Sequence, residues 1–272
     1  MLVSKLVNIK VIIFGIAVAI TMVSCHESKK TVMPAHPEEI MVFAAASLTQ
    51  SFEEIAEKFK QKKNVEVVFN FAGSQTLATS IIQGVKADVF ASANMDYMKF
   101  LNQKGFIEES QIFAKNRLII CKNKKSRTTI KVLEDLSNSV IKLIVGDESV
   151  PVGKYFYTVL EDAVKNQSLE EEFKQKIIAN IKSEELNVKD IVSKIIIGEA
   201  DAGIVYRTDV NEKNMYQLEI VEMKEFEETE AKYTIGVVQA APNNEAARIF
   251  VDFVVSSEGK EILKKYGFIV GN

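Results

Sequence analysis

Residues 43–49 read FAAASLT, and this short stretch decides how the chain folds. The apolar run 40–43 that leads into it has the composition of a fully buried strand. Downstream, apolar residues recur at helical spacing, at Leu48, Phe52, Ile55 and Phe59. Ser47 stands at the junction with Gln50 three residues on, which predicts that the helix begins there with a capping box.

A helix that begins directly after a strand points its first backbone N–H groups and the positive end of its dipole outward. Such a terminus favours an anion. The pattern occurs again where the strand expected over 65–71 is followed by Ser74 and a helix that Gly84 closes. Ser47 and Ser74 are therefore candidate anion-binding residues. A serine in such a place can also do no more than cap its helix, and the local pattern alone leaves both interpretations open.

Strands and helices alternate along the rest of the chain. Further strands are expected near 88–91, 116–121, 141–145, 202–206 and 233–238, and further helices near 95–101, 155–160, 188–196, 244–255 and 258–265. This alternation predicts an α/β protein with mostly parallel sheets covered by helices on both faces. The strands near 117–121 and 233–238 are expected to be hinges between an outer unit built from both ends of the chain and an inner unit built from its middle.

The N-terminus has the features of a secretory signal over residues 1–24, where two lysines precede the apolar run 11–23. That run is too short to span a membrane comfortably. Residues 22–25 read MVSC and resemble the lipobox of bacterial lipoproteins, which predicts that Cys25 is lipidated and becomes the new N-terminus. Residues 25–37 are then a lipidated end and a polar tether.

Composition narrows the classes of function. Hydrophobic residues make up 47% of the chain and charged residues 26%, as in ordinary globular proteins. A formal net charge of −3 argues against nucleic acid as a partner. The two histidines, His26 and His36, both lie in the tether, so the folded body offers no histidine for a serine or cysteine triad or for a zinc site. An enzyme that uses Ser47 as nucleophile is the competing hypothesis, and it lacks this base. Cys121 lies in an apolar run and is expected to be a buried structural thiol.

Several segments, taken in their order along the chain, resemble the molybdate-binding proteins of ABC transporters. They are 42–49, 71–78, 87–93, 116–118, 146–155, 199–206 and 257–268. The resemblance covers about residues 40–270. It implies a two-lobed type II periplasmic-binding-protein fold, with each lobe a mostly parallel sheet flanked by helices and with two hinge strands between them. The lobes implied are 38–118 with 234–272, and 119–233.

The same resemblance implies the residues of a binding site. Ser47 and Ser74 would come from the first lobe, and Val152, Val188 and Tyr206 from the second. The serines and the tyrosine would donate hydroxyl groups, and the valines backbone N–H groups. Molybdenum would be held as molybdate through these donors, with no direct protein–metal ligand and no cofactor.

The function implied is capture of molybdate, and of tungstate, for delivery to the permease of an ABC transporter, without catalysis. The protein would be a monomer, held on the extracytoplasmic side of the cell membrane by lipid on Cys25. A binding protein for sulfate, thiosulfate or another oxyanion on the same scaffold is the alternative.

Overall fold

The computed structural model describes residues 38–271. The predicted signal over 1–24, the lipidation at Cys25 and the tether to residue 37 lie outside the described residues. Within residues 38–271, no helix is both long enough and apolar enough to cross a membrane.

The first sheet has the strand order β2-β1-β3-β9-β4. Its strands are β1 (Glu38–Ala45), β2 (Val65–Ala72), β3 (Val89–Ser92), β4 (Ile107–Asn123) and β9 (Glu230–Val238). The strands β1, β2 and β3 pair in parallel, whereas β9 runs antiparallel to both β3 and β4. Three strands next to one another in this sheet thus end at the same edge, where the first two candidate serines lie.

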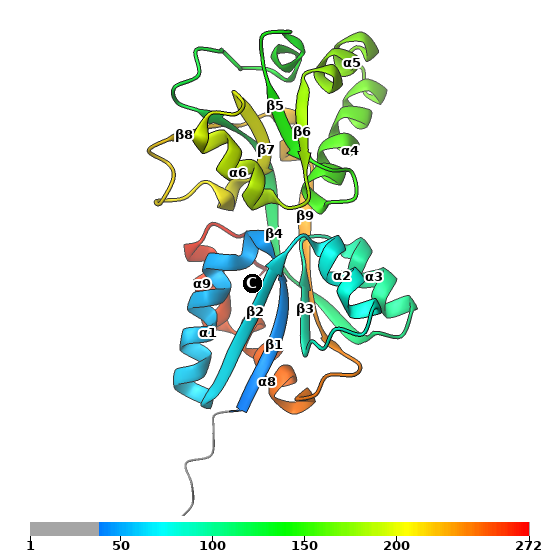
Figure 1. Ribbon diagram of the computed structural model, residues 1–272, viewed down its shortest axis with the longest axis vertical. Helices are drawn as coiled ribbons and strands as arrows, with labels where there is room; N and C mark the ends of the chain where they lie inside the picture. Colours follow the sequence, from blue (N-terminus) through cyan, green and yellow to red (C-terminus); the bar gives the residue numbers. More distant parts are fainter. Residues whose placement is uncertain (1–37, 272) are drawn as a thin grey trace, which may run out of the picture. The chain divides into compact units, whose positions relative to one another are not determined.

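Helices cover both faces of the first sheet (Figure 1). They are α1 (Thr49–Lys63), α2 (Ser74–Ile82), α3 (Met95–Gln103), α8 (Asn244–Val255) and α9 (Ser257–Lys265). On one face, Phe52 and Phe59 of α1 meet Phe250 of α8 edge-to-face, with ring centroids 6.2 Å and 5.2 Å apart. On the other face, Leu77 of α2 and Met98 of α3 belong to a separate buried cluster. The two clusters fix the sheet between two helical layers.

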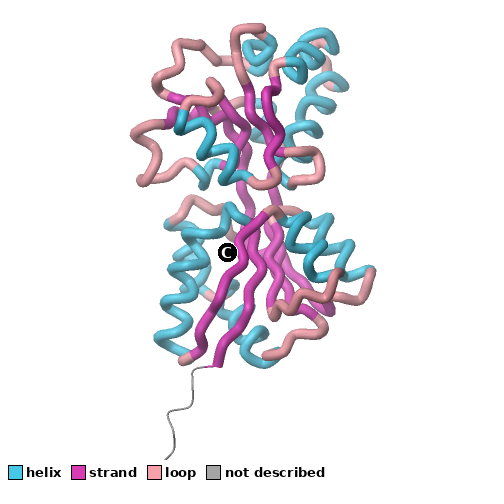
Figure 2. The backbone as a smooth tube through the Cα atoms, viewed as in Figure 1, coloured by secondary structure: helices cyan, strands magenta, loops and turns pink. Residues whose placement is uncertain are grey.

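The second sheet contains β5 (Leu143–Gly146), β6 (Ile181–Glu185), β7 (Ala202–Tyr206) and β8 (Leu218–Val221). The strands β6, β5 and β7 are neighbours in parallel pairs, while β7 and β8 both run antiparallel to β4. Its helices and short 3-10 turns are α4 (Pro151–Lys165), α5 (Glu171–Ala179), α6 (Val188–Ile197), α7 (Lys224–Glu227), η2 (Leu133–Ser137) and η3 (Arg207–Asp209). Figure 2 shows the strands of both sheets with helices around them.

One strand belongs to both sheets. β4 pairs with β9 as far as Arg117 and with β7 from Leu118 onward. The predicted hinge strands, near 117–121 and 233–238, lie within β4 and β9. Among the described residues, every antiparallel strand pair involves β4 or β9. The parallel pairing predicted from the alternation of strands and helices holds for the other pairs.

Several local predictions are confirmed. The strand expected over 202–206 is β7, and Gly198 ends α6 with a φ of 83°, in the left-handed region that favours glycine. The buried thiol of Cys121 is confirmed, and burial raises its pKa to about 12. Four helices and strands, α5, β6, β8 and α7, are absent from the sequence prediction. The residues of β6, Ile181–Glu185, are mostly polar, and the strand forms because β5 offers it a parallel partner.

Candidate anion-binding site

All five candidate residues line one small cavity with a volume of about 20 Å³. They come from both sheets: Ser47 follows β1, Ser74 follows β2, Val152 and Val188 begin helices after β5 and β6, and Tyr206 ends β7. Small or apolar residues and one amide complete the lining, namely Ala45, Ala46, Ala72, Gly73, Ala93, Val150 and Pro151, with Asn187 as the amide. Each candidate is less than a tenth exposed.

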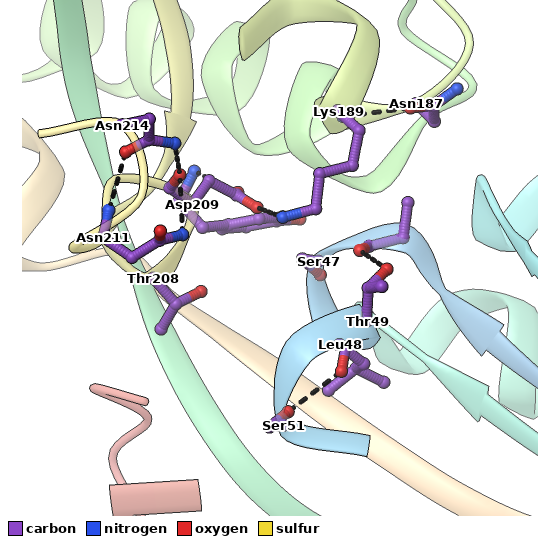
Figure 3. A network of polar contacts seen from close by, with 12 residues as sticks. Ser47, Leu48, Thr49, Ser51, Asn187, Lys189, Thr208, Asp209, Asn211 and Asn214 are labelled. Carbon is purple, nitrogen blue, oxygen red and sulfur yellow. Dashed lines mark hydrogen bonds and ion pairs between the residues drawn. The ribbon is translucent and has the colours of Figure 1, made fainter. Parts of the chain in front are cut away.

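Ser47 does not cap a helix, and the predicted capping box with Gln50 is wrong. A 3-10 turn, η1 (Ala46–Leu48), follows β1, and α1 begins only at Thr49, with no side-chain cap. At the start of α1, two hydroxyl groups donate back to carbonyl oxygens of the 3-10 turn (Figure 3). Thr49 Oγ1 donates to Ala46 at 2.7 Å, and Ser51 Oγ donates to Leu48 at 3.0 Å. The Ser47 hydroxyl is therefore left for another partner, and its Oγ lies 2.8 Å from the phenol oxygen of Tyr233.

Ser74 is the first residue of α2 and lies directly after Gly73. Its side chain makes no cap bond to the helix; its Oγ accepts a hydrogen bond of 3.1 Å from the backbone N–H of Ala93. The interpretation of Ser74 as only a cap is therefore excluded. Its oxygen is already engaged as an acceptor, which leaves its O–H hydrogen to donate elsewhere.

Two helices begin on the opposite side of the cavity. Val152 is in the first turn of α4, after Pro151, whose missing N–H costs nothing at the first helical position. Val188 is the first residue of α6, where the Asn187 side chain accepts from the backbone N–H groups of Lys189 and Asp190 at 3.0 and 3.1 Å. That cap satisfies later N–H groups of the turn. First-turn N–H groups such as those of Val152 and Val188 have no partner inside their helices.

The phenol oxygen of Tyr206 is the most informative atom of the cavity. Its side chain is 2% exposed, and its phenol oxygen has no hydrogen-bond partner among the described residues. Burial raises the pKa of this phenol well above its ordinary value, so it keeps its proton and can donate. Its ring packs edge-to-face on Tyr233, with centroids 5.7 Å apart. A buried hydroxyl without a partner is costly and indicates a ligand atom that is not part of the chain.

Charge near the cavity is neutralised. None of the described residues that line the cavity is charged. The nearest ion pair on α6 joins Lys189 Nζ to Asp209 Oδ1 at 3.2 Å, and the Asp209 side chain is completely buried (Figure 3). Burial raises the pKa of this carboxyl, while Lys189 and the N–H of Tyr206 oppose the rise. Over residues 38–271, no cluster of three or more histidine, cysteine or acidic side chains could hold a metal ion.

Direct contacts join the two sides around the cavity. Gln75 Nε2 donates to the carbonyl oxygen of Leu186 at 2.7 Å, and Lys154 Nζ lies 2.6 Å from Asp96 Oδ2. The Tyr97 hydroxyl donates to the carbonyl oxygen of Ser149. The cavity is thus enclosed between helices of both sheets, and its unpaired polar groups are hydrogen-bond donors. Such an arrangement can surround a small anion that carries no proton.

The sequence did not identify Tyr233, Asn116 or the Ala93 N–H as parts of this polar network. Tyr233 and Asn116 lie in segments expected to be strands, and a strand pattern does not show which hydroxyl a buried side chain reaches. A tyrosine in an otherwise aliphatic strand was the available signal, because buried phenols usually have a polar partner.

Comparison with known proteins gives a consistent result. The family model for bacterial extracellular solute-binding proteins matches residues 40–269. The molybdate-binding protein ModA of Mycobacterium tuberculosis is 34% identical over 91% of this chain and 92% of its own, and that of Escherichia coli is 30% identical over 85% and 89%. A substrate-binding domain assigned to a molybdenum ABC transporter of Clostridium difficile superimposes with a TM-score of 0.62, at 27% identity, over 86% of this chain and 99% of its own. These likenesses confirm the fold class expected from the sequence.

Proposed function

Because this chain belongs to the bacterial extracellular solute-binding proteins, we propose that it captures molybdate and delivers it to the permease of an ABC transporter. The single observation that carries this proposal is the cavity itself, where neutral donors from both sheets surround a space of a few atoms. A site for a sugar, an amino acid or a peptide needs more room than this cavity has.

In the proposed complex, Ser47, Ser74 and Tyr206 donate their hydroxyl hydrogens to molybdate oxygens, and Val152 and Val188 donate backbone N–H groups. Molybdenum stays covered by its own oxygens and meets no protein ligand. Hydrogen bonds to a charged group contribute roughly 1.5–3 kcal/mol each, so five donors give roughly 7–15 kcal/mol before losses. Immobilisation and ordering remove several kcal/mol of this gain.

The neutral donor set favours an anion that has lost all its protons. Molybdate and tungstate satisfy that condition at pH 7 and are close in size, so we propose that the site takes both. Sulfate is also free of protons at this pH but smaller, and donors spaced for the larger anion reach its oxygens less well. Sulfate, thiosulfate or a similar oxyanion is the alternative ligand for the same site.

We further propose that residues 38–118 with 234–272 form one lobe and residues 119–233 the other. The transfer of β4 from β9 to β7 near residue 118 supports this division. Closure of the lobes would bring the donors together. The chain would act as a monomer outside the cytoplasm, held to the membrane by lipid on Cys25, and would hand its ligand to the permease without a catalytic step.

Titration calorimetry of the purified protein against molybdate, tungstate, sulfate and phosphate tests the proposal. The expected result is strong binding of molybdate and tungstate, much weaker binding of sulfate and none of phosphate. Clear binding of sulfate with none of molybdate would replace the proposal with its alternative. Absence of binding for all four anions would contradict both.

A further inference from the structure

We propose that Tyr233 is a positioning residue that occupies one lone pair of the Ser47 oxygen and so directs the Ser47 hydrogen to the ligand, which makes the site favour oxyanions that carry no proton. This inference rests on the proposed function and adds to it a determinant of ligand choice. Tyr233 does not line the cavity, and it acts on the ligand only through Ser47.

The contact at the centre of the inference joins two hydroxyl groups. Ser47 Oγ and Tyr233 Oη lie 2.8 Å apart, and both side chains are buried. From distance alone either oxygen could be the donor. The choice has a chemical consequence, because a serine that donates to Tyr233 offers lone pairs to the ligand, whereas a serine that accepts from Tyr233 offers its hydrogen.

Asn116 decides the direction. The backbone N–H of Arg117 donates to Asn116 Oδ1 at 3.0 Å, which identifies the oxygen end of this side-chain amide. The amide nitrogen therefore faces Thr208 Oγ1 at 2.8 Å and Tyr233 Oη at 3.5 Å. An amide NH₂ group only donates, so Tyr233 accepts from Asn116 and must direct its own hydrogen elsewhere.

Ser47 is the partner that remains for that hydrogen. The other nearby hydroxyl, that of Tyr206, does not meet hydrogen-bond geometry with Tyr233, whereas Ser47 Oγ lies 2.8 Å from Tyr233 Oη. Burial raises the pKa of Tyr233 well above its ordinary value, so the phenol keeps its hydrogen at neutral pH. The bonds thus run from Asn116 to Tyr233 to Ser47, and the hydrogen of Ser47 is left for the ligand.

Ser74 is set in the same direction by a different group. The backbone N–H of Ala93 donates to its Oγ at 3.1 Å, which again leaves the serine hydrogen free. The third hydroxyl, on Tyr206, has no partner of its own among the described residues. A proton on the ligand would face the hydrogens that Ser47 and Ser74 direct into the cavity, and an unmatched buried donor is costly.

A double-mutant cycle on molybdate binding tests the inference, with the variants Tyr233→Phe, Ser47→Ala and both together. Phenylalanine keeps the ring that packs on Tyr206 and Phe268 and removes only the hydroxyl. We expect Tyr233→Phe to weaken molybdate binding about tenfold in the natural background and less than about twofold when Ser47 is already alanine. Equal weakening in both backgrounds would overturn the inference, because Tyr233 would then act without Ser47.

Ligand choice gives a second measurement that a purely structural role would not change. Without the Tyr233 hydroxyl, Ser47 is free to accept, so the preference for molybdate over inorganic phosphate, measured by competition, should fall at least about tenfold. An unchanged preference would overturn the inference. Tyr216→Phe is the matched control, since Tyr216 is 69% exposed and outside the cavity. Failure of the unaltered protein to bind molybdate would instead refute the proposed function, and this inference with it.

Discussion

At the scale of single residues, the Tyr206 hydroxyl is the group whose energy depends most on the ligand. It is buried, protonated and without a partner among the described residues, so in this arrangement the protein itself leaves the polar group unmatched, at a cost in free energy. That cost is about 1–3 kcal/mol for a buried donor. An oxyanion that accepts from this hydroxyl would remove the cost and add a charge-assisted bond, so part of the proposed binding energy would come from matching this group.

Tyr206→Phe should therefore change stability and affinity in opposite directions. Without ligand, the variant should be more stable by about 1 kcal/mol, because the unmatched hydroxyl is gone. Molybdate should bind about 1.5–3 kcal/mol more weakly, because a bond to a charged group is lost. Thermal denaturation and calorimetry measure the two effects. A loss of ligand-free stability would show that the hydroxyl has a partner inside the protein.

The same variant should alter stability at alkaline pH. An unfolded tyrosine loses its proton near pH 10, whereas burial keeps the proton on folded Tyr206 to a higher pH. Ionisation of the unfolded tyrosine therefore leaves stability unchanged below pH 10 and lowers it as pH rises from there toward the pKa of the folded state. Each such group contributes about 1.4 kcal/mol per pH unit in that range. Denaturant titrations between pH 9 and about pH 11 should show a slope shallower by about that amount in Tyr206→Phe.

Ser47→Ala should weaken molybdate binding by about 1.5–3 kcal/mol through loss of one charge-assisted bond. Ser80→Ala is a suitable control, since Ser80 is half-buried, lies outside the cavity lining, and its hydroxyl donates to the carbonyl of Thr76 in its own helix. Calorimetry on both variants provides the measurement. Equal affinities for the two variants would remove Ser47 from the proposed site.

The sequence predicts residues of this site better than their hydrogen bonds. Ser47 and Ser74 stand out because each follows a strand and precedes a helix, and the structure places both at the cavity. The partner of Ser47 is 186 positions away in the chain, at Tyr233, and no local pattern contains that pairing. Local spacing also predicted a cap at Ser47, and the 3-10 turn before α1 explains why the prediction failed.

At the scale of elements, the cavity depends on how closely α4 approaches the end of β5. A Cβ atom added to Gly153 would overlap the backbone carbonyl oxygens of Gly146 and Asp147. Gly153 therefore allows the first turn of α4, with the N–H of Val152, to lie against the strand. Elements with a strong local pattern, such as β7 and α6, follow the prediction, whereas polar β6 depends on its neighbours and was not predicted.

Gly153→Ala should displace the start of α4 and weaken molybdate binding at least about tenfold, which is about 1.4 kcal/mol. Because backbone atoms cannot move aside cheaply, ligand-free stability should fall too, by about 1–3 kcal/mol. Gly271→Ala is the control, since nothing lies within 4 Å of a Cβ atom at that position. Calorimetry and denaturant unfolding of both variants would show whether this close approach matters.

At the scale of the whole described chain, close packing between α2 and the segment before α6 limits which residue can occupy the position of Gly73. A Cβ atom there would overlap the carbonyl oxygen of Leu186, the same oxygen that accepts from Gln75. Gly73 lies on the strand-to-helix junction beside β2, and Leu186 on the junction after β6. In the proposed closure, this contact would form as the two sides of the cavity come together.

Gly73→Ala should therefore weaken molybdate binding about tenfold or more while leaving ligand-free unfolding nearly unchanged, because it hinders only the meeting of the two sides. Stopped-flow measurement should place most of the effect in faster dissociation. A large loss of ligand-free stability would show instead that the overlap is also present before ligand binds.

The strand shared by the two sheets has a consequence for release. Since β4 runs without a break from one sheet into the other, separating the two sides requires bending this backbone and parting Gln75 from Leu186 and Lys154 from Asp96. An anion enclosed in this cavity could not dissociate by breaking its hydrogen bonds one after another. In the proposed function, the residence time of the anion would be set by how often the protein opens, and a transporter that receives the anion would have to force that opening rather than compete for the anion itself.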